Sequence, residues 1–255
     1  MISISILLGI VVGAFGTLIG AGGGFVLVPI LLFLLPQIEA THVVAISMLA
    51  VAANAVSGSL AYARKKQIHW RSAIVFSLVG APGIWLGTYL NSKLDRQEFE
   101  QIFGPFMVLI AIYLFYRTFK AKAVDAHQIM LTRQKWVAGC VVSALVGVLA
   151  SFLGIGGGII HVPFLSQALE YPVHLATGTS HFVLAVTATI AVLDHFVSGH
   201  YAQLEAWVYF LVLGIIAGAQ IGARLSKRVS SKMILRLLAL ALISVGIRLC
   251  IRAYS

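Results

Sequence analysis

Two glycine-rich segments are the strongest candidates for a binding site. One is Gly-Ala-Gly-Gly-Gly at 20–24, and the other is Gly-Ile-Gly-Gly-Gly at 154–158. Glycines interrupt a helix, and a helix that starts directly after them presents unpaired N–H groups and the positive end of its dipole. Anions bind at such helix starts, and the missing side chains let an anion come close. The glycines predicted to bind an anion are Gly20, Gly22, Gly23, Gly24, Gly154, Gly156, Gly157 and Gly158.

Several other kinds of site do not fit this sequence. Neither glycine segment is followed by the Gly-Lys-Ser/Thr of a nucleotide-binding loop, and the metal motif His-Glu-x-x-His is absent. The 8 acidic residues lie in loops or near the ends of apolar runs, so a cation pathway is not expected. Cys140 and Cys250 lie inside apolar runs and indicate no disulfide framework. We therefore predict neither a metal nor a cofactor.

The elements that carry the glycine segments are predicted to be membrane helices. The chain has 255 residues, of which 60% are hydrophobic and 10% charged, with a mean hydropathy of +0.99. A soluble domain has about 25% charged residues. Apolar runs fall at 2–35, 40–63, 72–90, 101–119, 136–169, 174–193, 206–223 and 233–251. Their length and composition predict an all-α polytopic membrane protein.

The net charge of +10 points to the membrane as well. Lys and Arg form short clusters between the apolar runs, as in the cytoplasmic loops of membrane proteins, and no continuous basic face is available. The predicted partners are therefore the lipid bilayer and a small anionic substrate, with no nucleic acid.

Two of the apolar runs are too long for one membrane helix. The runs 2–35 and 136–169 would each extend about 51 Å as a single helix, whereas the hydrocarbon core is about 30 Å thick. Each run contains one of the glycine segments. We therefore expect both to be broken at their glycines, either as a discontinuous helix or as a re-entrant segment.

These two runs are also copies of each other. A shift of 134 positions superimposes the glycine segments, and it also superimposes Val28-Pro29 on Val162-Pro163. The similarity continues into the following helices, where Ser47 corresponds to Ser180. The sequence therefore predicts a first transmembrane repeat at 1–119, a polar linker at 120–135 and a second repeat at 136–255. Each repeat contains a glycine-broken segment plus three transmembrane helices, a construction usual in secondary transporters.

The distribution of Lys and Arg favours inverted repeats. If each broken segment dips in and returns, most of these residues fall on one side of the membrane. If each broken segment crosses once, the two sides are more nearly equal. Because positive loops stay in the cytoplasm, we expect inverted repeats with both chain ends outside.

Comparing the repeats isolates the polar residues that only the second one has. His161 and His181 stand where the first repeat has Leu27 and Met48. Ionisable residues within a membrane commonly mark ion or proton pathways, so both histidines are predicted to take part in proton coupling, and His161 also in binding. The hydroxyl residues predicted to hold the anion are Ser47, Thr179 and Ser180. The alternative for each hydroxyl is a helix–helix hydrogen bond of about 0.6 kcal/mol.

The paired motifs resemble a known family. Both glycine segments read Gly-x-Gly-Gly-Gly-(x)3-Val-Pro, and they are accompanied by Ala-Thr-Gly-Thr-Ser at 176–180 and Gly-Ala-Pro-Gly-(x)3-Gly at 80–87. In these features the chain is similar to the sulfite exporter TauE/SafE family of membrane permeases, over nearly its whole length. The resemblance implies an anion permease of the bacterial cytoplasmic membrane that exports sulfite or a related sulfur-containing anion such as an organosulfonate.

Three other functions stay open at this stage. A passive anion channel would use the same positive helix ends. A permease could carry another small carboxylate or oxyanion. A membrane-embedded enzyme would need a nucleophile, an acid–base pair or a metal cluster, whereas the sequence offers scattered histidines. We therefore expect a secondary transporter rather than an enzyme.

Overall fold

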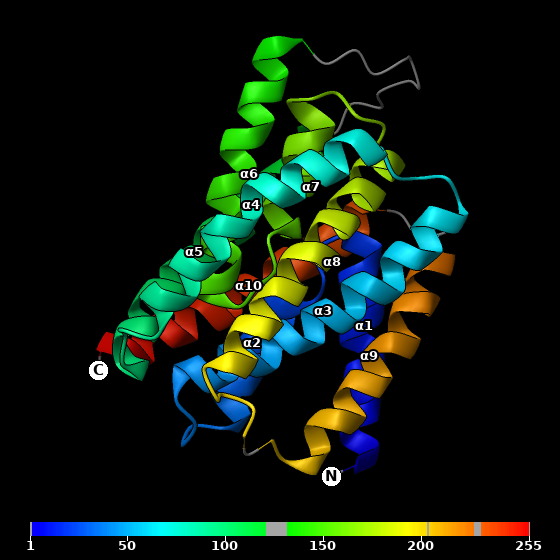
Figure 1. Cartoon of the computed structure of the whole chain (residues 1–255). Helices are drawn as coiled ribbons and strands as arrows, with labels where there is room; N and C mark the ends of the chain where they lie inside the picture. The colour runs from blue at the N-terminus through cyan, green and yellow to red at the C-terminus, as the bar shows by residue number, and fades with distance from the viewer. Residues whose placement is uncertain (1, 121–131, 203, 227–230, 255) are drawn as a thin grey trace.

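The computed structural model shows a bundle of α-helices joined by short loops (Figure 1). It describes residues 2–120, 132–202, 204–226 and 231–254. The helices are α1 (Ile2–Ile19), α2 (Gly24–Leu34), α3 (Ala40–Arg64), α4 (Trp70–Asn91), α5 (Arg96–Lys120), α6 (Arg133–Leu153), α7 (Gly158–Gln167), α8 (Val173–Val197), α9 (Ala206–Leu225) and α10 (Ser231–Tyr254). Most of the predicted linker, residues 121–131, lies outside the described residues.

The all-helical membrane architecture predicted from the sequence is confirmed. Within the described part of the chain, six helices are long and apolar enough to cross a bilayer, namely α1, α3, α4, α6, α8 and α9. Large apolar side chains cover their outer faces, as Leu7 on α1 and Leu145 on α6 illustrate with exposed fractions of 64% and 58%. Such faces suit lipid and not water.

Both long apolar runs are broken at their glycines, as predicted. The run 2–35 splits into α1 and α2, and the run 136–169 splits into α6 and α7. Gly20 and Gly154 end the first helix of each pair with φ values of +79° and +68°. This left-handed backbone is unfavourable for residues with a Cβ atom, so glycine sets where each helix stops.

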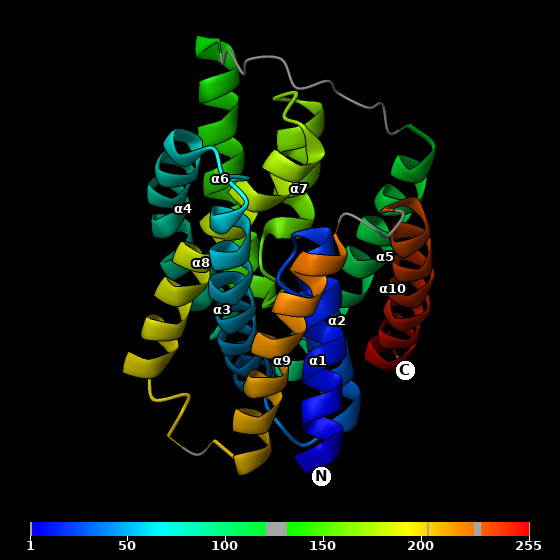
Figure 2. The same ribbon diagram turned by 90° about the vertical axis from the view of Figure 1, so that its right-hand side faces the viewer.

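Each broken segment folds back as a helical hairpin. Figures 1 and 2 show that α1 and α2 enter from the end of the molecule where the N-terminus lies, and that α6 and α7 enter from the opposite end. The long helices α3 and α8 lie side by side and run in opposite directions (Figure 2).

The first helix of each hairpin packs against a helix of the other half of the chain. Helix α1 packs along α9 of the second half, and α6 packs along α4 of the first half. Small residues permit the close approach, since Gly13 faces the backbone of Ile215 and Gly147 faces the backbone of Gly80. The helices α5 and α10 form a further pair at the side of the bundle (Figure 2). Each hairpin is therefore held by helices of the other half.

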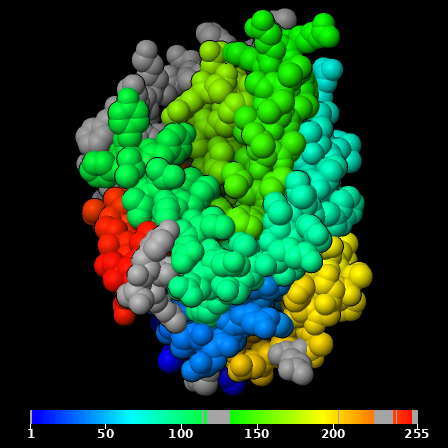
Figure 3. Space-filling model, turned by 90° about the vertical axis from the view of Figure 1, so that its left-hand side faces the viewer, coloured from blue at the N-terminus to red at the C-terminus, as the bar shows by residue number. Residues whose placement is uncertain are grey.

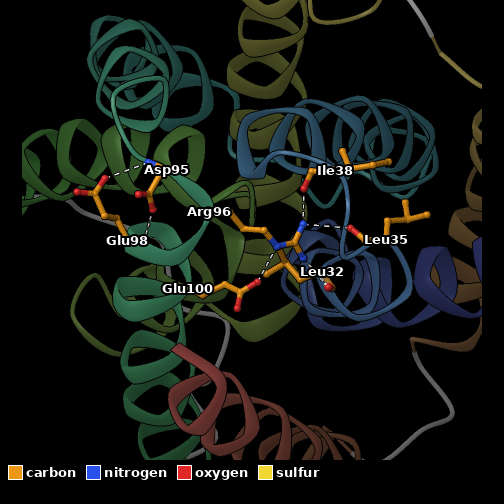
Figure 4. Close-up of polar contacts among 7 residues, drawn as sticks. All are labelled: Leu32, Leu35, Ile38, Asp95, Arg96, Glu98 and Glu100. Atoms are coloured by element: carbon orange, nitrogen blue, oxygen red, sulfur yellow. Dashed lines mark hydrogen bonds and ion pairs between the residues drawn. The ribbon is translucent and has the colours of Figure 1, made fainter. Parts of the chain in front are cut away.

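The C-terminal end of α2 is fixed by a side chain from α5. Figure 4 shows the Arg96 guanidinium donating to the carbonyl oxygens of Leu32, Leu35 and Ile38, at 2.6 Å to Leu32 and 3.0 Å to Leu35. Its Nε donates to Glu100 Oε1 at 2.9 Å. A cation at the end of a helix satisfies carbonyls that lack helical partners, so Arg96 anchors α2 to α5.

On one side of the molecule α5 stands apart from the hairpin of the second half. Figure 3 shows α7 between α5 and α6. The groove there has a volume of about 470 Å³ and is lined by apolar side chains that include Ile110, Ile160 and Phe164. It faces the surface that the membrane would cover, whereas the candidate site lies deeper in the bundle.

Candidate functional site

The two glycine segments meet inside the bundle. A Cβ atom added to Gly24, the first residue of α2, would lie 2.5 Å from the carbonyl oxygen of Gly154. The reciprocal contact joins Gly158, the first residue of α7, to the carbonyl oxygen of Gly20. Only glycine at these positions lets the two turns pass so closely. The sequence-predicted glycines are thus brought together, four from each half.

An apolar side chain from each half covers this crossing. Val51 of α3 and Leu184 of α8 contact both Gly22 and Gly156. Both side chains are buried, with exposed fractions of 0% and 2%. The crossing is therefore closed by a dry contact between the two long helices.

A small cavity lies beside the crossing, on the side of the second half. Its volume of about 10 Å³ is close to the minimum that holds one water molecule. Helices α6, α7 and α8 form its walls, and the polar side chains among its lining residues are Ser143, His161, Ser180 and Thr187. The first residues of α7 also line it, so the unpaired N–H groups of a helix start face the same region.

The imidazole of His161 is held in one orientation by Ser143. The Ser143 hydroxyl donates to the carbonyl oxygen of Gly139 at 2.7 Å, and its oxygen lies 3.0 Å from His161 Nε2. Because a hydroxyl has one proton and that proton goes to Gly139, the serine oxygen accepts from Nε2–H. In the neutral imidazole this makes Nδ1 the nitrogen without a proton, and Nδ1 is buried with no hydrogen-bond partner.

Ser180 is the second buried group without a partner at the cavity. Its side-chain oxygen forms no hydrogen bond, although the residue is only 1% exposed. An unpaired buried polar atom costs about 1–3 kcal/mol, so such atoms are rare and often have a functional role. Together, Ser180 offers a donor and His161 Nδ1 offers an acceptor to whatever enters the cavity.

The other predicted hydroxyls have partners within the protein. Ser47, which occupies the position of Ser180 in the first half, donates to the carbonyl oxygen of Gly154 at 2.6 Å. Thr179 accepts from the backbone N–H of His69 at 3.0 Å. The structure places both residues next to the site but not on the cavity.

The second predicted histidine lies apart from the first. His181 is fully buried and packs edge-on against Tyr62, with ring centroids 5.5 Å apart. Its ring lies beside the backbone of Gly20, and neither ring nitrogen forms a hydrogen bond of ordinary geometry. It is not among the residues that line the cavity with His161.

Ser143 and Thr187 line the cavity but were not among the predicted site residues. The comparison of repeats contains a signal for Ser143, because the first repeat has Gly9 at that position, but none for Thr187, because the first repeat has the polar Asn54 there. Nothing in the sequence separates these two positions from other small polar residues of membrane helices. Their role depends on which helix they face.

The comparisons with known proteins agree on one family. A family profile described as sulfite exporter TauE/SafE matches residues 5–249. The chain is 32% identical over 267 residues to the probable membrane transporter protein YunE of Bacillus subtilis. The aligned region covers 96% of this chain and 96% of YunE. It is 30% identical to a probable membrane transporter protein of Xylella fastidiosa, over 93% of this chain and 90% of that protein.

A more distant relative comes from an archaeon. The probable membrane transporter protein MJ0441 of Methanocaldococcus jannaschii is 27% identical over 82% of this chain and 76% of its own length. No solved structure matches the chain significantly. The profile covers nearly the whole sequence, and the broken helices that it spans are those described above. The chain therefore belongs to the sulfite exporter TauE/SafE family and is a multi-pass membrane transporter.

Proposed function

We propose that this transporter exports a small sulfur-containing anion, such as sulfite or an organosulfonate, across the bacterial cytoplasmic membrane and performs no catalysis. The family to which the chain belongs is described as a family of sulfite exporters. The geometry supports an anion, because the start of α7 and the hydroxyl of Ser180 offer donors to the same cavity.

The observation that carries this proposal is the pair of unpartnered atoms at the cavity, His161 Nδ1 and Ser180 Oγ. A tetrahedral or pyramidal oxyanion can accept from Ser180 and from the N–H groups at the start of α7. If the oxyanion carries a proton, as hydrogen sulfite does, its O–H can donate to His161 Nδ1. The ligand then satisfies both groups that are unsatisfied in its absence.

The same geometry supports coupling to protons. His161 Nδ1 is unprotonated in the hydrogen-bonding pattern described above and can accept a proton from the ligand or from a neighbouring group. A histidine that carries a proton in one orientation of the transporter and releases it in the other would link anion movement to the proton gradient. His181 is the second proposed carrier of this proton, because its imidazole is fully buried next to the backbone of Gly20.

Movement of the hairpins would give the anion access. A cavity of about 10 Å³ is too small for sulfite, so the present arrangement has no room for the anion. We propose that residues 1–119 and 136–255 are inverted repeats that rock against each other at the contact of Val51 with Leu184. The opposite directions of α3 and α8 and the reciprocal packing of the hairpins support this proposal.

The orientation in the membrane follows from the charges. The end of α3 lies close to the end of α9, since Lys65 Nζ donates to the carbonyl oxygen of Ala223 at 2.5 Å. Both ends carry basic residues, among them Arg64, Lys66 and Arg224. We place this side in the cytoplasm by the positive-inside rule, with the N-terminus on the opposite side.

Counterflow in proteoliposomes tests the proposed function. Vesicles preloaded with unlabelled sulfite are expected to take up radiolabelled sulfite transiently, and an excess of organosulfonate should suppress that uptake. Suppression by small carboxylates alone would assign another substrate class. Protein-dependent conductance of anions without counterflow would overturn the carrier in favour of a channel.

A further inference from the structure

A groove opens on the side of the bundle between α5 and the hairpin of the second half. Its volume is about 470 Å³, and it is lined by α5, α6 and α7 through side chains such as Tyr113, Val142 and Phe164. Figure 3 shows that its walls meet where α5 begins and diverge toward the end where α6 begins. The groove is therefore a wedge that opens toward one end of the molecule.

A second hollow continues this groove along α6. It has a volume of about 520 Å³ and is lined by α6 between Arg133 and Val142. Val142 borders both hollows, so they form one depression, which we call the α6 groove. The helix rises about 14 Å from Arg133 to Val142, and half of a hydrocarbon core is about 15 Å thick. The α6 groove therefore extends over the depth of about one leaflet of a bilayer.

The size and the lining of the α6 groove fit a fatty-acyl chain. A water molecule occupies about 30 Å³ of liquid and a methylene group takes a similar volume, so the hollow of about 470 Å³ holds about 15 methylene groups. Its side chains are mostly apolar, and Val137 and Val141 are exposed. A hydrocarbon chain can cover these side chains without leaving a polar group unsatisfied.

The α6 groove is basic at the end where α6 begins. Arg133 and Gln134 are exposed there, and no carboxylate among the described residues pairs with Arg133. The nearby Lys135 is neutralised by Glu170, whose Oε2 lies 2.6 Å from the Lys135 Nζ. A guanidinium without a carboxylate partner can bind two oxygens of a phosphate. An apolar floor with a positive charge at one end matches the two parts of an anionic phospholipid.

The basic end of the α6 groove lies at the cytoplasmic side of the molecule. Helices α4 and α6 run parallel, since Gly80 lies against Ser143 and Gly87 lies against Val148. Because α4 begins shortly after the basic end of α3, the start of α6 lies on the side that we place in the cytoplasm. In the cytoplasmic leaflet, anionic lipids produce a negative surface potential that attracts basic residues.

We propose that the α6 groove binds one anionic phospholipid of the cytoplasmic leaflet, with an acyl chain along α6 and α7 and its phosphate beside Arg133. The acyl chain contacts Ile160 and Phe164 of α7, whereas His161 of the same helix lines the cavity of the candidate site. The lipid therefore supports, from the outside, a helix that forms one wall of the cavity. This inference does not depend on which anion is transported.

Native mass spectrometry of the whole chain tests the preference for an anionic headgroup. The protein is mixed with equal amounts of phosphatidylglycerol and phosphatidylcholine that have identical acyl chains. We expect one phosphatidylglycerol to be retained about fivefold more strongly, the effect of one basic residue near an anionic surface. Arg133→Gln should abolish this preference, whereas the control Lys93→Gln, exposed at the opposite end of α4, should keep it. Equal retention of both lipids by the wild type would overturn the proposal.

Filling the groove tests the position of the acyl chain. Val142→Trp and Ala168→Trp each place a large side chain in the α6 groove. They should lower the retention of both lipids about tenfold, as expected when about two methylene groups lose their contacts. Ala168 is exposed, so its replacement preserves the fold even if Val142→Trp does not, and the melting temperature without lipid verifies this. Leu213→Trp on the exposed face of α9 is the matched control. Retention at the wild-type level in both groove variants would contradict the proposed site.

A second copy of the chain is the alternative occupant of the α6 groove. A dimer in the mass spectrum that excludes phosphatidylglycerol and dissociates in Ala168→Trp would overturn lipid binding in favour of self-association. None of these measurements uses sulfite. A failure of the proposed transport and a failure of lipid binding are therefore distinguishable.

Discussion

The two halves of the chain contain the same broken-helix motif, yet their polar groups are used differently. In the first half, Asn54 donates to the carbonyl oxygen of Gly13 at 2.7 Å and accepts from Thr17 at 3.1 Å. The Tyr62 hydroxyl donates to the backbone of Thr17 at 2.9 Å. In the second half, the corresponding region contains the cavity with the unpartnered atoms of His161 and Ser180.

This difference shows how a duplicated fold can divide its tasks. The residue of the first half that corresponds to His161 is Leu27, and Leu27 is fully buried in the apolar core. The hydrogen bonds among Asn54, Thr17 and Tyr62 make this region of the first half a structural support, because none of these groups gains from a ligand. The second half keeps polar groups unsatisfied at a cost in stability, which a bound anion would recover.

The largest effect is expected where both halves depend on the same contact. Gly158→Ala and Gly24→Ala each place a Cβ atom against the backbone of the opposite turn, which should destabilise the protein by about 3 kcal/mol or more. Thermal unfolding of the purified protein in detergent measures this loss. Gly199→Ala is the control, because its Cβ meets nothing within 4 Å and its cost is limited to a φ of +78°, about 1 kcal/mol. Equal melting temperatures for all three variants would contradict the proposed close crossing.

Replacing His161 by the residue of the first half should remove function but not the fold. His161→Leu is expected to reduce sulfite counterflow about tenfold or more, because the buried acceptor disappears. The melting temperature should be unchanged or higher, since an apolar side chain replaces an unsatisfied polar one. Leu27→Met serves as the control in the first half and should transport within about twofold of the wild type. Normal counterflow by His161→Leu would refute the division between the halves.

The first half should respond in the opposite way. Asn54→Ala breaks two buried hydrogen bonds and is expected to cost about 2 kcal/mol of stability. Counterflow per folded molecule should stay within about twofold of the wild type. Ser77→Ala, which removes one bond within a single helix, should cost about 0.5 kcal/mol. A selective loss of transport in Asn54→Ala would assign the first half a direct role in binding.

The smallest effect concerns the loop before α4. His69 is the N-cap of α4, and its Nδ1 lies 2.9 Å from Ser72 Oγ and 3.3 Å from Tyr171 OH. Burial, and then the nearby charge of Arg71, lower the pKa of His69 below 6.5. The unfolded chain therefore binds more protons, so stability falls as the pH drops below about 6.5.

Replacing this histidine should weaken the pH dependence. His69→Asn retains a capping side chain and removes the titrating group, so its melting temperature should vary less between pH 7 and pH 5. The equivalent helix of the second half, α9, has Glu205 as its N-cap, and the side chain of Glu205 forms no capping bond. Identical pH dependence in His69→Asn and the wild type would show that other groups control it.

The sequence was sufficient to predict the membrane class, the breaks and the family. Long apolar runs require helices in a bilayer, and glycine at 20–24 and 154–158 interrupts them by local backbone preference. The comparison of repeats also identified His161 as the polar residue to examine. These predictions depend on composition, length and local conformation, all of which are present in the chain before it folds.

Only the tertiary structure decided which polar groups have partners. Ser47 and Ser180 occupy equivalent positions, yet Ser47 donates to Gly154 across the molecule and Ser180 has no partner. Ser143 orients His161 because α6 and α7 fold back on each other, and α6 is held in place by α4 of the other half. Such contacts join residues far apart in the chain, and the local periodicity of a sequence does not determine them.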